Sequence, residues 1–367
     1  MPAEPAATDL PAVTIVFLVF NRRDELRESL GRMLSDLDYP RDRLDVVVVD
    51  NASTDGSAEM VRSEFSDVRL IIHERNVGVS GFNSGFAAAH GDWILALDDD
   101  CYLPPDGLRR ALEAGRQHAA DLVSFEVIST ADPAYSFTDS YRTGLFTFWG
   151  CAVLMRRKVL EALGGYDPDI FVWANELEFM LRFFDHGFRH LHLPEVAAQH
   201  MKRPPPFGLP YSESNWQPHF YNCRHFAYIA AKLLQPRDAA EALVAIFVRA
   251  TVLTLRVWRG AAPGIWLTFV GMAQGLRRRD PVDARVSRFY RRNFETFASP
   301  WWLWRSPLER FSKQRAPVSQ REDQLLTADR RRGYFDRRAH LYPKSAATLD
   351  FTGLREPSGG SRTGRSL

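Results

Sequence analysis

Three consecutive aspartates, Asp98, Asp99 and Asp100, directly follow the short apolar run of residues 93–97. The run predicts a buried strand, so the carboxylates stand at a rigid position. Three carboxylates at one rigid point repel one another and lose hydration unless a positive charge joins them. A divalent cation such as Mg²⁺ meets this need, because hard cations take oxygen ligands and bridge to substrate phosphates. Alternate residues of an extended chain face the same way, so Asp98 and Asp100 are predicted to share the cation while Asp99 points elsewhere. A solvated acidic turn is the alternative for this triplet taken alone.

Two further polar segments follow predicted strands. Asp50 begins the segment 50–57 and can accept a hydrogen bond from a nucleotide base, although a capped turn without a ligand explains this segment equally simply. The segment 75–85 contains three glycines that permit close backbone approach to a ligand near the start of a helix. Its glycine spacing does not match the dinucleotide-binding pattern G-x-G-x-x-G.

Alternating strands and helices are predicted to position these groups. Four β-branched or apolar runs are predicted as buried parallel strands: residues 13–19, 46–49, 68–72 and 93–97. Three helices are predicted between them: residues 24–34, 57–65 and 80–90. Asn21 is expected to cap the first helix. These repeated units predict an α/β fold with an open, mostly parallel sheet flanked by helices. Ligands of such sheets bind outside the carboxyl ends of the strands, where Asp50 and the three aspartates stand.

The second half of the chain has a different pattern. A strand is predicted at 148–155, a helix at 175–185 and a returning segment toward His200. Three prolines at 204–206 indicate a boundary. Long helical patterns follow it at residues 221–234, 239–258 and 265–278.

Composition and cysteine content indicate a globular protein from a reducing compartment. The chain has 367 residues, of which 45% are hydrophobic and 25% charged, as in globular proteins with a sizeable core. Its three cysteines are far apart, which favours a reducing compartment. The N-terminus lacks the pattern of a signal peptide, so a cytoplasmic location is expected.

Basic residues are concentrated near the C-terminus. Residues 277–367 contain 21 Lys/Arg against 10 Asp/Glu, although the formal net charge of the whole chain is +2. Trp258, Trp266, Trp301, Trp302 and Trp304 lie in or near the uncharged stretch 260–276 and its flanking arginines. This pattern suits contact with the anionic inner face of the cell membrane, and it suits a packed helical domain equally. No recognition fold for nucleic acid accompanies the basic surplus, so nucleic acid is not an expected partner.

Several segments together resemble the family 2 glycosyltransferases with the GT-A fold, especially the rhamnosyl- and galactofuranosyltransferase-like members. In order, they are Phe20-Asn21-Arg22, the segment 49–57, Asn76-x-Gly78, Gly81-x-Asn83-x-Gly85 and the triplet Asp98–Asp100. The resemblance covers roughly residues 12–203, with a weaker similarity in the helical part. Each motif alone is modest, but all of them in order within the first hundred residues are specific. The resemblance implies the GT-A fold, a nucleotide-sugar donor and a saccharide or lipid-linked acceptor.

The resemblance also implies roles for residues of the donor site. Asp50 would bind the nucleotide base, with Arg75 and the backbone around Phe20, Asn21 and Arg22 beside it.

Other matches of the motifs fall on the diphosphate and sugar of the donor. Asp98 and Asp100 match the family's D-x-D motif, which holds the ribose and diphosphate through Mg²⁺ or Mn²⁺, and Asp99 is assigned to the donor with Asp98. Asn83 would line the sugar pocket. His200 is the expected third metal ligand, since imidazole is a plausible partner of two carboxylates.

The segment 173–182 resembles the family's Glu-Asp-x-Asp-Leu-x-x-Arg motif but departs from it. When the segment is aligned on Arg182, Asn175 replaces the usual Glu and Glu176 stands where the family has its catalytic Asp. Glu178 takes the next acidic position. A general base must reach the proton of the acceptor hydroxyl, and the sequence leaves open whether Glu176 or Glu178 does so.

These observations predict an inverting, metal-dependent glycosyltransferase. The expected parts are a disordered N-terminus (1–11), a catalytic domain (12–205), a helical region with features of membrane association (206–310) and a basic, partly disordered tail (311–367). A nucleotidyltransferase is one alternative, but the segment after the first strand lacks the glycine-rich loop that grips a triphosphate. A non-catalytic, membrane-associated scaffold is the other, favoured by the departures at Asn175 and Glu176.

Overall fold

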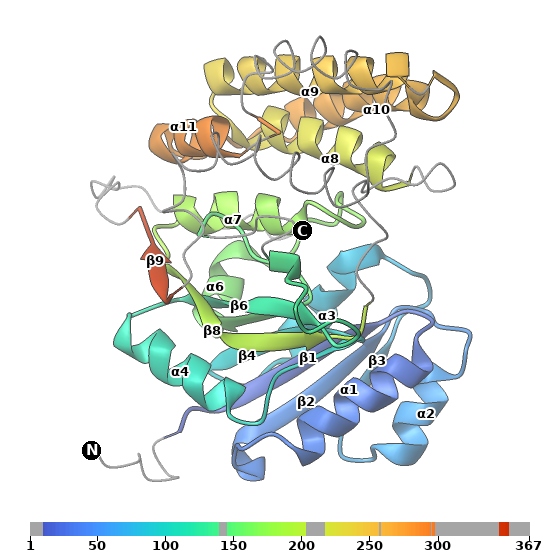
Figure 1. The fold of residues 1–367 in the computed structure, drawn as a ribbon, viewed down its shortest axis with the longest axis vertical. Coiled ribbons are helices and arrows are strands. Elements are labelled where there is room, and N and C mark those ends of the chain that lie inside the picture. The colour runs from blue at the N-terminus through green and yellow to red at the C-terminus, as the bar shows by residue number, and fades with distance from the viewer. Residues whose placement is uncertain are drawn as a thin grey trace.

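The computed structural model describes residues 10–138, 145–202, 217–256, 258–294, 296–297 and 345–351. Within them, one nine-stranded sheet has the strand order β3-β2-β1-β4-β7-β6-β8-β5, and β9 pairs with β8 (Figure 1). In chain order the strands are β1 (Val13–Val19), β2 (Leu44–Asp50), β3 (Arg69–Ile72), β4 (Trp93–Asp98), β5 (Cys101–Tyr102), β6 (Leu122–Ser129), β7 (Ala152–Arg156), β8 (His190–His200) and β9 (Ala347–Leu349).

The predicted parallel strands are present, and their register aligns the site. β1 pairs in parallel with β2 on one side and β4 on the other, with Val19 opposite Asp50 and Leu18 opposite Asp98. The backbone of Val13–Val19 is almost entirely buried, as its β-branched and apolar sequence predicts. Asp50 and Asp98 are therefore the last residues of the two strands that flank β1, and they lie at the same end of the sheet.

The sheet is mixed beyond β4. β7 runs antiparallel to both β4 and β6, and β6 runs parallel to β8. The end of β8 then pairs antiparallel with β5, with His200 opposite Cys101. This reversal brings His200 beside the residues that follow the aspartate triplet.

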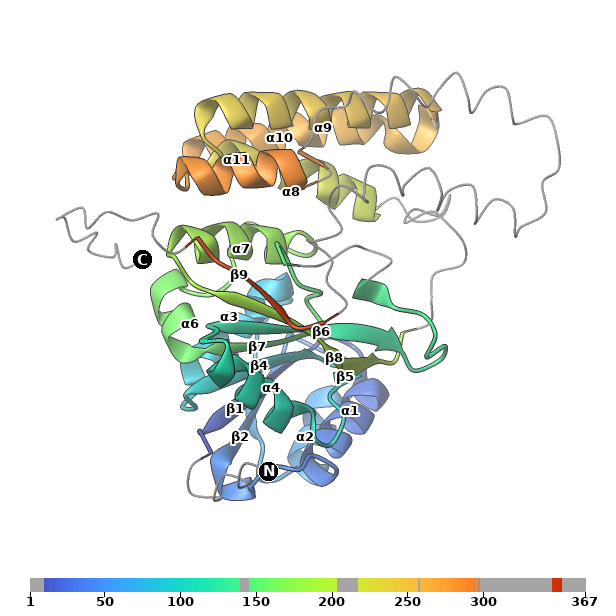
Figure 2. The same cartoon turned by 60° about the vertical axis from the view of Figure 1, so that its left-hand side comes forward.

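Helices cover both faces of the sheet (Figures 1 and 2). One face carries α1 (Arg23–Ser35), α2 (Ser57–Glu64) and α4 (Gly107–Gln117), and the other carries α3 (Phe82–Ala88), α6 (Arg157–Leu163) and α7 (Asn175–Asp185). The short 3-10 helices η2 (Arg41–Arg43) and η3 (Gly78–Gly81) complete this part. Two buried clusters of apolar side chains fill the two faces.

A helical extension lies on α7. It consists of α8 (Gln217–Leu233), α9 (Pro236–Arg256), α10 (Trp258–Arg277) and α11 (Ala284–Asn293), and it forms a further layer above the part of the molecule that contains the sheet (Figures 1 and 2). Tyr228 of α8 and Phe179 of α7 belong to one continuous core. Among the described residues, no helix combines the length and apolarity that crossing a membrane requires.

Three local expectations are corrected by the structure. Asn21 does not cap α1, because the helix begins at Arg23 and the Asn21 side chain instead accepts a hydrogen bond from the Thr54 backbone N–H at 2.7 Å. The free N–H of Arg23 is bound by the Asp55 carboxylate at 2.9 Å. The helix expected from residue 265 begins at Trp258 and contains Pro263, and the strand expected from residue 148 begins at Ala152.

Several predicted features lie outside the described residues. They are the N-terminal residues 1–9, the proline boundary at 204–206, the tryptophans at 301, 302 and 304, and the C-terminal tail apart from residues 345–351. Within that last segment, β9 pairs antiparallel with β8, with Leu349 opposite His190.

Candidate active site

The aspartate triplet lies at the meeting point of β1, β4 and β8. The Asp99 carboxylate accepts a hydrogen bond from the Phe20 backbone N–H at 3.3 Å. Arg22 forms an ion pair with Asp100, and its guanidinium lies 3.6 Å from Asp99. On the other side of Asp100, His200 Nε2 lies 3.1 Å from the carboxylate. The structure therefore brings Arg22, the triplet and His200 together.

Burial changes the pKa values of the three aspartates in this cluster. Burial, and after it the charge of Asp100, raises the pKa of Asp98 to about 7. Burial also raises the pKa of Asp99 well above its usual range. Burial would raise the pKa of Asp100 too, but hydrogen bonds and charges from His200 and Arg22 hold it below its ordinary value. The two basic side chains thus compensate Asp100 but leave negative charge on the cluster incompletely balanced.

The donor set suits a divalent cation completed by a substrate. Asp98, Asp100 and His200 provide carboxylate oxygens and an imidazole, which Mg²⁺ and Mn²⁺ accept. His200 Nδ1 is buried without a hydrogen-bond partner. Over the described parts of the chain, no three such side chains already converge as a metal cage. A cation at this position would therefore need further ligands, such as the phosphates of a substrate.

Asp50 offers a buried acceptor at the end of β2. One carboxylate oxygen accepts from the Ser53 backbone N–H at 2.6 Å, whereas Oδ2 is buried without a hydrogen-bond partner. Ile72 is the partner of Asp50 in β3 and is 45% exposed, and Phe20, which follows the β1 partner Val19, is 43% exposed. Arg75 is exposed beyond β3. This end of the sheet presents an unsatisfied acceptor between apolar surfaces, which suits a planar base with N–H donors.

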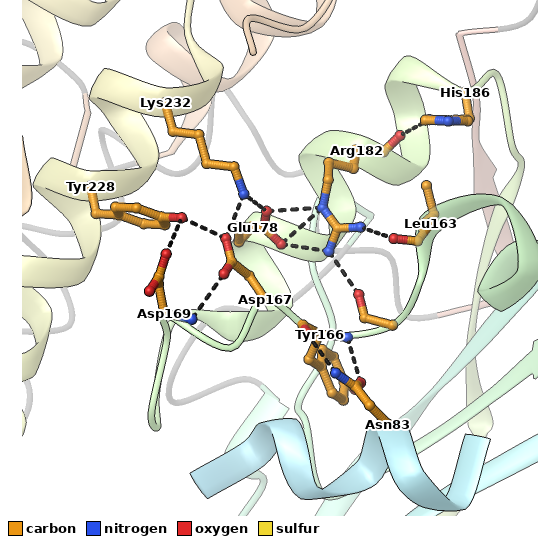
Figure 3. A network of polar contacts seen from close by, with 11 residues as sticks. Asn83, Leu163, Tyr166, Asp167, Asp169, Glu178, Arg182, His186, Tyr228 and Lys232 are labelled. Atoms are coloured by element: carbon orange, nitrogen blue, oxygen red, sulfur yellow. Dashed lines mark hydrogen bonds and ion pairs between the residues drawn. The ribbon is translucent and has the colours of Figure 1, made fainter. Parts of the chain in front are cut away.

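Asn83, which the resemblance assigns to the sugar pocket, forms two hydrogen bonds with the backbone of Tyr166. Its side-chain Nδ2 donates to the Tyr166 carbonyl at 2.8 Å, and its Oδ1 accepts from the Tyr166 backbone N–H at 2.8 Å (Figure 3). A Cβ at Gly165 would lie 2.3 Å from the Asn83 Oδ1. The Asn83 side chain therefore holds the segment before α7 against α3.

Glu176 occupies the first turn of α7. Its carboxylate accepts hydrogen bonds from its own backbone N–H and from that of Gly150, and a Cβ on Gly150 would lie 2.2 Å from Glu176 Oε1. Burial raises the pKa of Glu176 to about 7 although the residue keeps some exposed surface. Its charge contributes to the raised pKa of Asp98, so the two carboxylates lie within electrostatic reach of each other.

Glu178 is committed to a buried ion-pair network (Figure 3). It is fully buried, with Arg182 Nη2 at 2.6 Å from one oxygen and Lys232 Nζ at 2.8 Å from the other. Lys232 also pairs with Asp167, which accepts a hydrogen bond from the Tyr228 hydroxyl at 2.7 Å. Both oxygens of Glu178 are thus engaged: the Arg182 pair lies within α7, and the Lys232 pair connects α7 to α8.

Two of these residues, Asp167 and Lys232, were not identified from the sequence. Trp149 and Gly150 could be suggested from it as residues that shape an acceptor pocket, but the packing of Glu176 against Gly150 could not. Asp167 and Lys232 are 65 positions apart, so only the fold pairs them. One available signal was Lys232 itself, a charged residue within an otherwise apolar stretch of the helical pattern at 221–234.

Comparisons with known proteins identify a family and relatives for part of the chain. Residues 14–164 match the family described as Glycosyl transferase family 2. The chain is 28% identical over 220 residues to "Probable glycosyltransferase YdaM" of Bacillus subtilis, covering 52% of this chain and 50% of the relative. It is 32% identical over 115 residues to "Undecaprenyl-phosphate 4-deoxy-4-formamido-L-arabinose transferase" of Aeromonas hydrophila, covering 30% and 35%. The chain therefore spans half or less of the length of these curated relatives.

A solved structure supports the fold. Residues 1–349 of S. aureus TarS superpose with a TM-score of 0.51 at 16% identity, covering 76% of this chain and 91% of that one. The same fragment in complex with UDP-GlcNAc gives a TM-score of 0.50.

Proposed function

Because this chain belongs to the family 2 glycosyltransferases through its GT-A domain, we propose that it transfers a sugar from a nucleotide-sugar donor to an acceptor hydroxyl with inversion at the anomeric carbon. The observation that carries the proposal is the position of Glu176. A carboxylate with a raised pKa is held by Gly150 within electrostatic reach of the acidic cluster around Asp98. A base and a diphosphate-binding cluster on one site are the two parts that a single displacement needs.

The donor is proposed to lie along the carboxyl ends of β1, β2 and β4. The free Oδ2 of Asp50 would accept a hydrogen bond from the base, between Phe20 and Ile72. Arg75 and the backbone at Asn21 would complete this end. The TarS fragment forms a complex with UDP-GlcNAc, which supports a nucleotide-sugar donor here. The name of the A. hydrophila relative includes undecaprenyl phosphate, which supports a lipid-linked acceptor.

Asp98 and Asp100 are proposed to hold a divalent cation, with His200 as a third ligand and Asp99 directed toward the Phe20–Arg22 backbone. When bound there, Mg²⁺ or Mn²⁺ would neutralise the diphosphate leaving group. Arg22 would remain close enough to contact the same phosphates, since its side chain is already beside Asp99 and Asp100.

Glu176 is proposed as the base in preference to Glu178. Glu178 has Lys232 on one oxygen and Arg182 on the other, so proton uptake there would break buried ion pairs. Among the residues that the structure describes, the hydrogen-bond partners of Glu176 are backbone N–H groups, and its pKa is raised, which suits proton uptake near neutral pH. The acceptor hydroxyl loses its proton to Glu176 as its oxygen bonds to the anomeric carbon. The bond from that carbon to the phosphate oxygen breaks, and its electron pair leaves with the nucleoside diphosphate.

The test compares three full-length proteins: the wild type, Glu176→Gln and Asp100→Asn. Calorimetry measures binding of UDP, GDP and dTDP with Mn²⁺, and a coupled assay measures nucleotide release from a panel of nucleotide-sugars. Glu176→Gln is expected to bind the nucleotide normally and lose at least 100-fold in transfer rate. Asp100→Asn is expected to weaken nucleotide binding.

Glu161→Gln, on the exposed side of α6, is the matched control and should behave as the wild type. Full activity of Glu176→Gln would refute its role, and pyrophosphate release would indicate a nucleotidyltransferase.

We further propose that the outer surface of the helical extension contacts an anionic membrane where lipid-linked acceptors lie. Six large apolar side chains of α9 and α10 are exposed: Val244, Phe247, Leu255, Trp266, Phe269 and Leu276. Phe247 and Phe269 contact each other with ring centroids 5.5 Å apart, so the stripes of the two helices are continuous. These helices are the layer farthest from the sheet (Figure 2). An apolar stripe next to a run of arginines at 277–279 suits a lipid interface.

Vesicle sedimentation tests this surface. Wild-type protein should pellet with phosphatidylglycerol vesicles more than with phosphatidylcholine vesicles, and Leu255→Ser with Trp266→Ser should reduce pelleting at least fivefold. Gln117→Ser on α4, which lies on the opposite side of the sheet from α7, is the control. Equal pelleting of all three proteins would contradict the membrane contact.

A further inference from the structure

Exposed aromatic rings lie directly before the proposed base. Among the described residues of the catalytic part, the large apolar side chains that are exposed are Phe20, Ile72, Phe171 and Trp173. The first two flank Asp50 at the donor end. Phe171 and Trp173, which are 37% and 38% exposed, precede Glu176 by five and three positions. All four thus lie around the candidate active site rather than over the surface at large.

The helical extension supplies a third ring. Tyr221 of α8 stacks on Phe171 with centroids 6.0 Å apart and planes 17° apart, and it meets Trp173 edge-on at 5.5 Å. His225, one turn further along α8, donates from Nδ1 to the Trp173 carbonyl at 3.1 Å. We call Phe171, Trp173 and Tyr221 the aromatic platform. It joins the two parts of the molecule next to α7.

The platform is held rigidly in an uncommon backbone conformation. Trp173 and Ala174 have positive φ angles of 58° and 66°, which cost energy for residues with a side chain. The Phe171 carbonyl accepts from the Val79 backbone N–H at 2.8 Å, and Gly78 leaves no space there for a Cβ. Contacts from the donor-side loop and from α8 therefore fix a segment whose apolar rings still face solvent. A strained backbone that holds apolar rings in solvent indicates that this segment binds a ligand.

We propose that the aromatic platform binds a saccharide ring of the acceptor by stacking on Phe171 and Trp173. This inference depends on the proposed glycosyl transfer, and it names the acceptor side of the same site. A sugar ring has an apolar C–H face, which an aromatic face attracts, and a polar rim, which remains free for a base. Because Glu176 needs a hydroxyl to deprotonate, the ring stacked three residues before it carries that hydroxyl or adjoins it. A lipid chain would instead need a long apolar stripe, and α9 and α10 carry that stripe.

Fluorine NMR tests the platform without requiring turnover. The full chain is labelled with 5-fluorotryptophan, and Trp173→Phe identifies the Trp173 resonance among the 9 tryptophans. The probes are methyl glycosides of rhamnose, galactose, glucose, mannose and N-acetylglucosamine, added with UDP, GDP or dTDP and Mn²⁺. At least one glycoside is expected to shift the Trp173 resonance saturably. If no glycoside shifts it, or if only a polyprenyl phosphate in micelles does, the proposal is wrong.

Kinetics with the same glycosides separate this proposal from the proposed function. Phe171→Leu and Trp173→Leu should raise the KM for the glycoside about tenfold or more, whereas donor hydrolysis by water stays within twofold of the wild type. Phe65→Leu, at the end of α2, is the matched control. Unchanged KM values in both variants would overturn the platform while leaving glycosyl transfer intact. Absence of nucleotide-sugar binding in every protein would instead refute the proposed function, and the fluorine shift would still decide whether the platform binds sugars.

Discussion

Lys232 of α8 lies 2.8 Å from Glu178 of α7, so a buried ion pair connects the helical extension to the helix that begins with Asn175 and Glu176. Lys232 pairs at the same time with Asp167, on the segment that Asn83 holds through Tyr166 (Figure 3). The extension is therefore part of the structure that positions the proposed base.

Lys232→Met is expected to destabilise the protein. The substitution leaves Glu178 and Asp167 buried with fewer positive partners, and removing one partner of a buried pair costs about 3 kcal/mol or more. Arg182 still pairs with Glu178, which places the expected loss at the lower end of that range. Urea unfolding measures the free energy difference.

The control for this prediction is Arg237→Met. Arg237 pairs with Glu241 on α9, but its side chain is 92% exposed, so the expected loss is below about 0.5 kcal/mol. Equal stability losses for Lys232→Met and Arg237→Met would show that the buried network contributes nothing of its own.

Glu176→Gln is expected to stabilise the protein at high pH. Burial raises the Glu176 pKa from 4.5 to about 7, so between these values the folded chain keeps a proton that the unfolded chain has released. The free energy of unfolding of the wild type therefore falls as pH rises from 4.5 to 7. Above pH 7, the folded protein carries the whole cost of the buried Glu176 charge. At pH 8 the variant should be more stable by about 1–3 kcal/mol, since one pKa unit corresponds to about 1.4 kcal/mol. The difference should vanish near pH 4, as chemical denaturation at both pH values can show.

The same ionisation predicts a pH profile for transfer. A base must be deprotonated in the free enzyme, so log(kcat/KM) should rise with a slope of about one up to pH 7 and then level off. Glu176→Asp should keep measurable activity, because the carboxylate is retained, whereas Glu176→Gln should lose the pH-dependent part. An unchanged profile in Glu176→Gln would assign the titration to another group.

The sequence predicted the first half of the site better than the second. β1 was predicted with its observed bounds because its side chains are apolar on both faces, which is a local property. Asp50 and the aspartate triplet follow from those strands. The partners of Asn83 and Glu178 were not predictable, because Tyr166 and Lys232 lie 83 and 54 positions away from them. The cap of α1 by Asp55 and the reversal of direction at β7 are likewise tertiary features that no local pattern encodes.

Gly150→Ala is expected to impair catalysis without unfolding the protein. A Cβ at this position would lie 2.2 Å from Glu176 Oε1, so the carboxylate must move and lose its hydrogen bond from the Gly150 N–H. Transfer should fall 10-fold to 100-fold, since small displacements of a catalytic group are costly. The nucleotide dissociation constant should change less than twofold. Gly31→Ala on α1 has nothing within 4 Å of its added methyl group and should keep full activity.

Arg22→Ala tests whether the Arg22 guanidinium balances the charge of the aspartates when no metal ion is bound. In the protein without ligand, the Arg22 guanidinium pairs with Asp100 and lies 3.6 Å from Asp99, next to carboxylates that burial already disfavours in their charged form. Removing it should lower the melting temperature at pH 7.5, because the remaining negative charges repel one another. Mn²⁺ alone should then stabilise the variant more than the wild type, since no side chain competes for Asp100 and a cation that binds only the folded state raises its stability.

Arg23→Ala, which removes a neighbouring exposed arginine, is the matched control and should respond to Mn²⁺ as the wild type does. A smaller Mn²⁺ effect in Arg22→Ala than in the wild type would mean that Arg22 assists cation binding instead of competing with it.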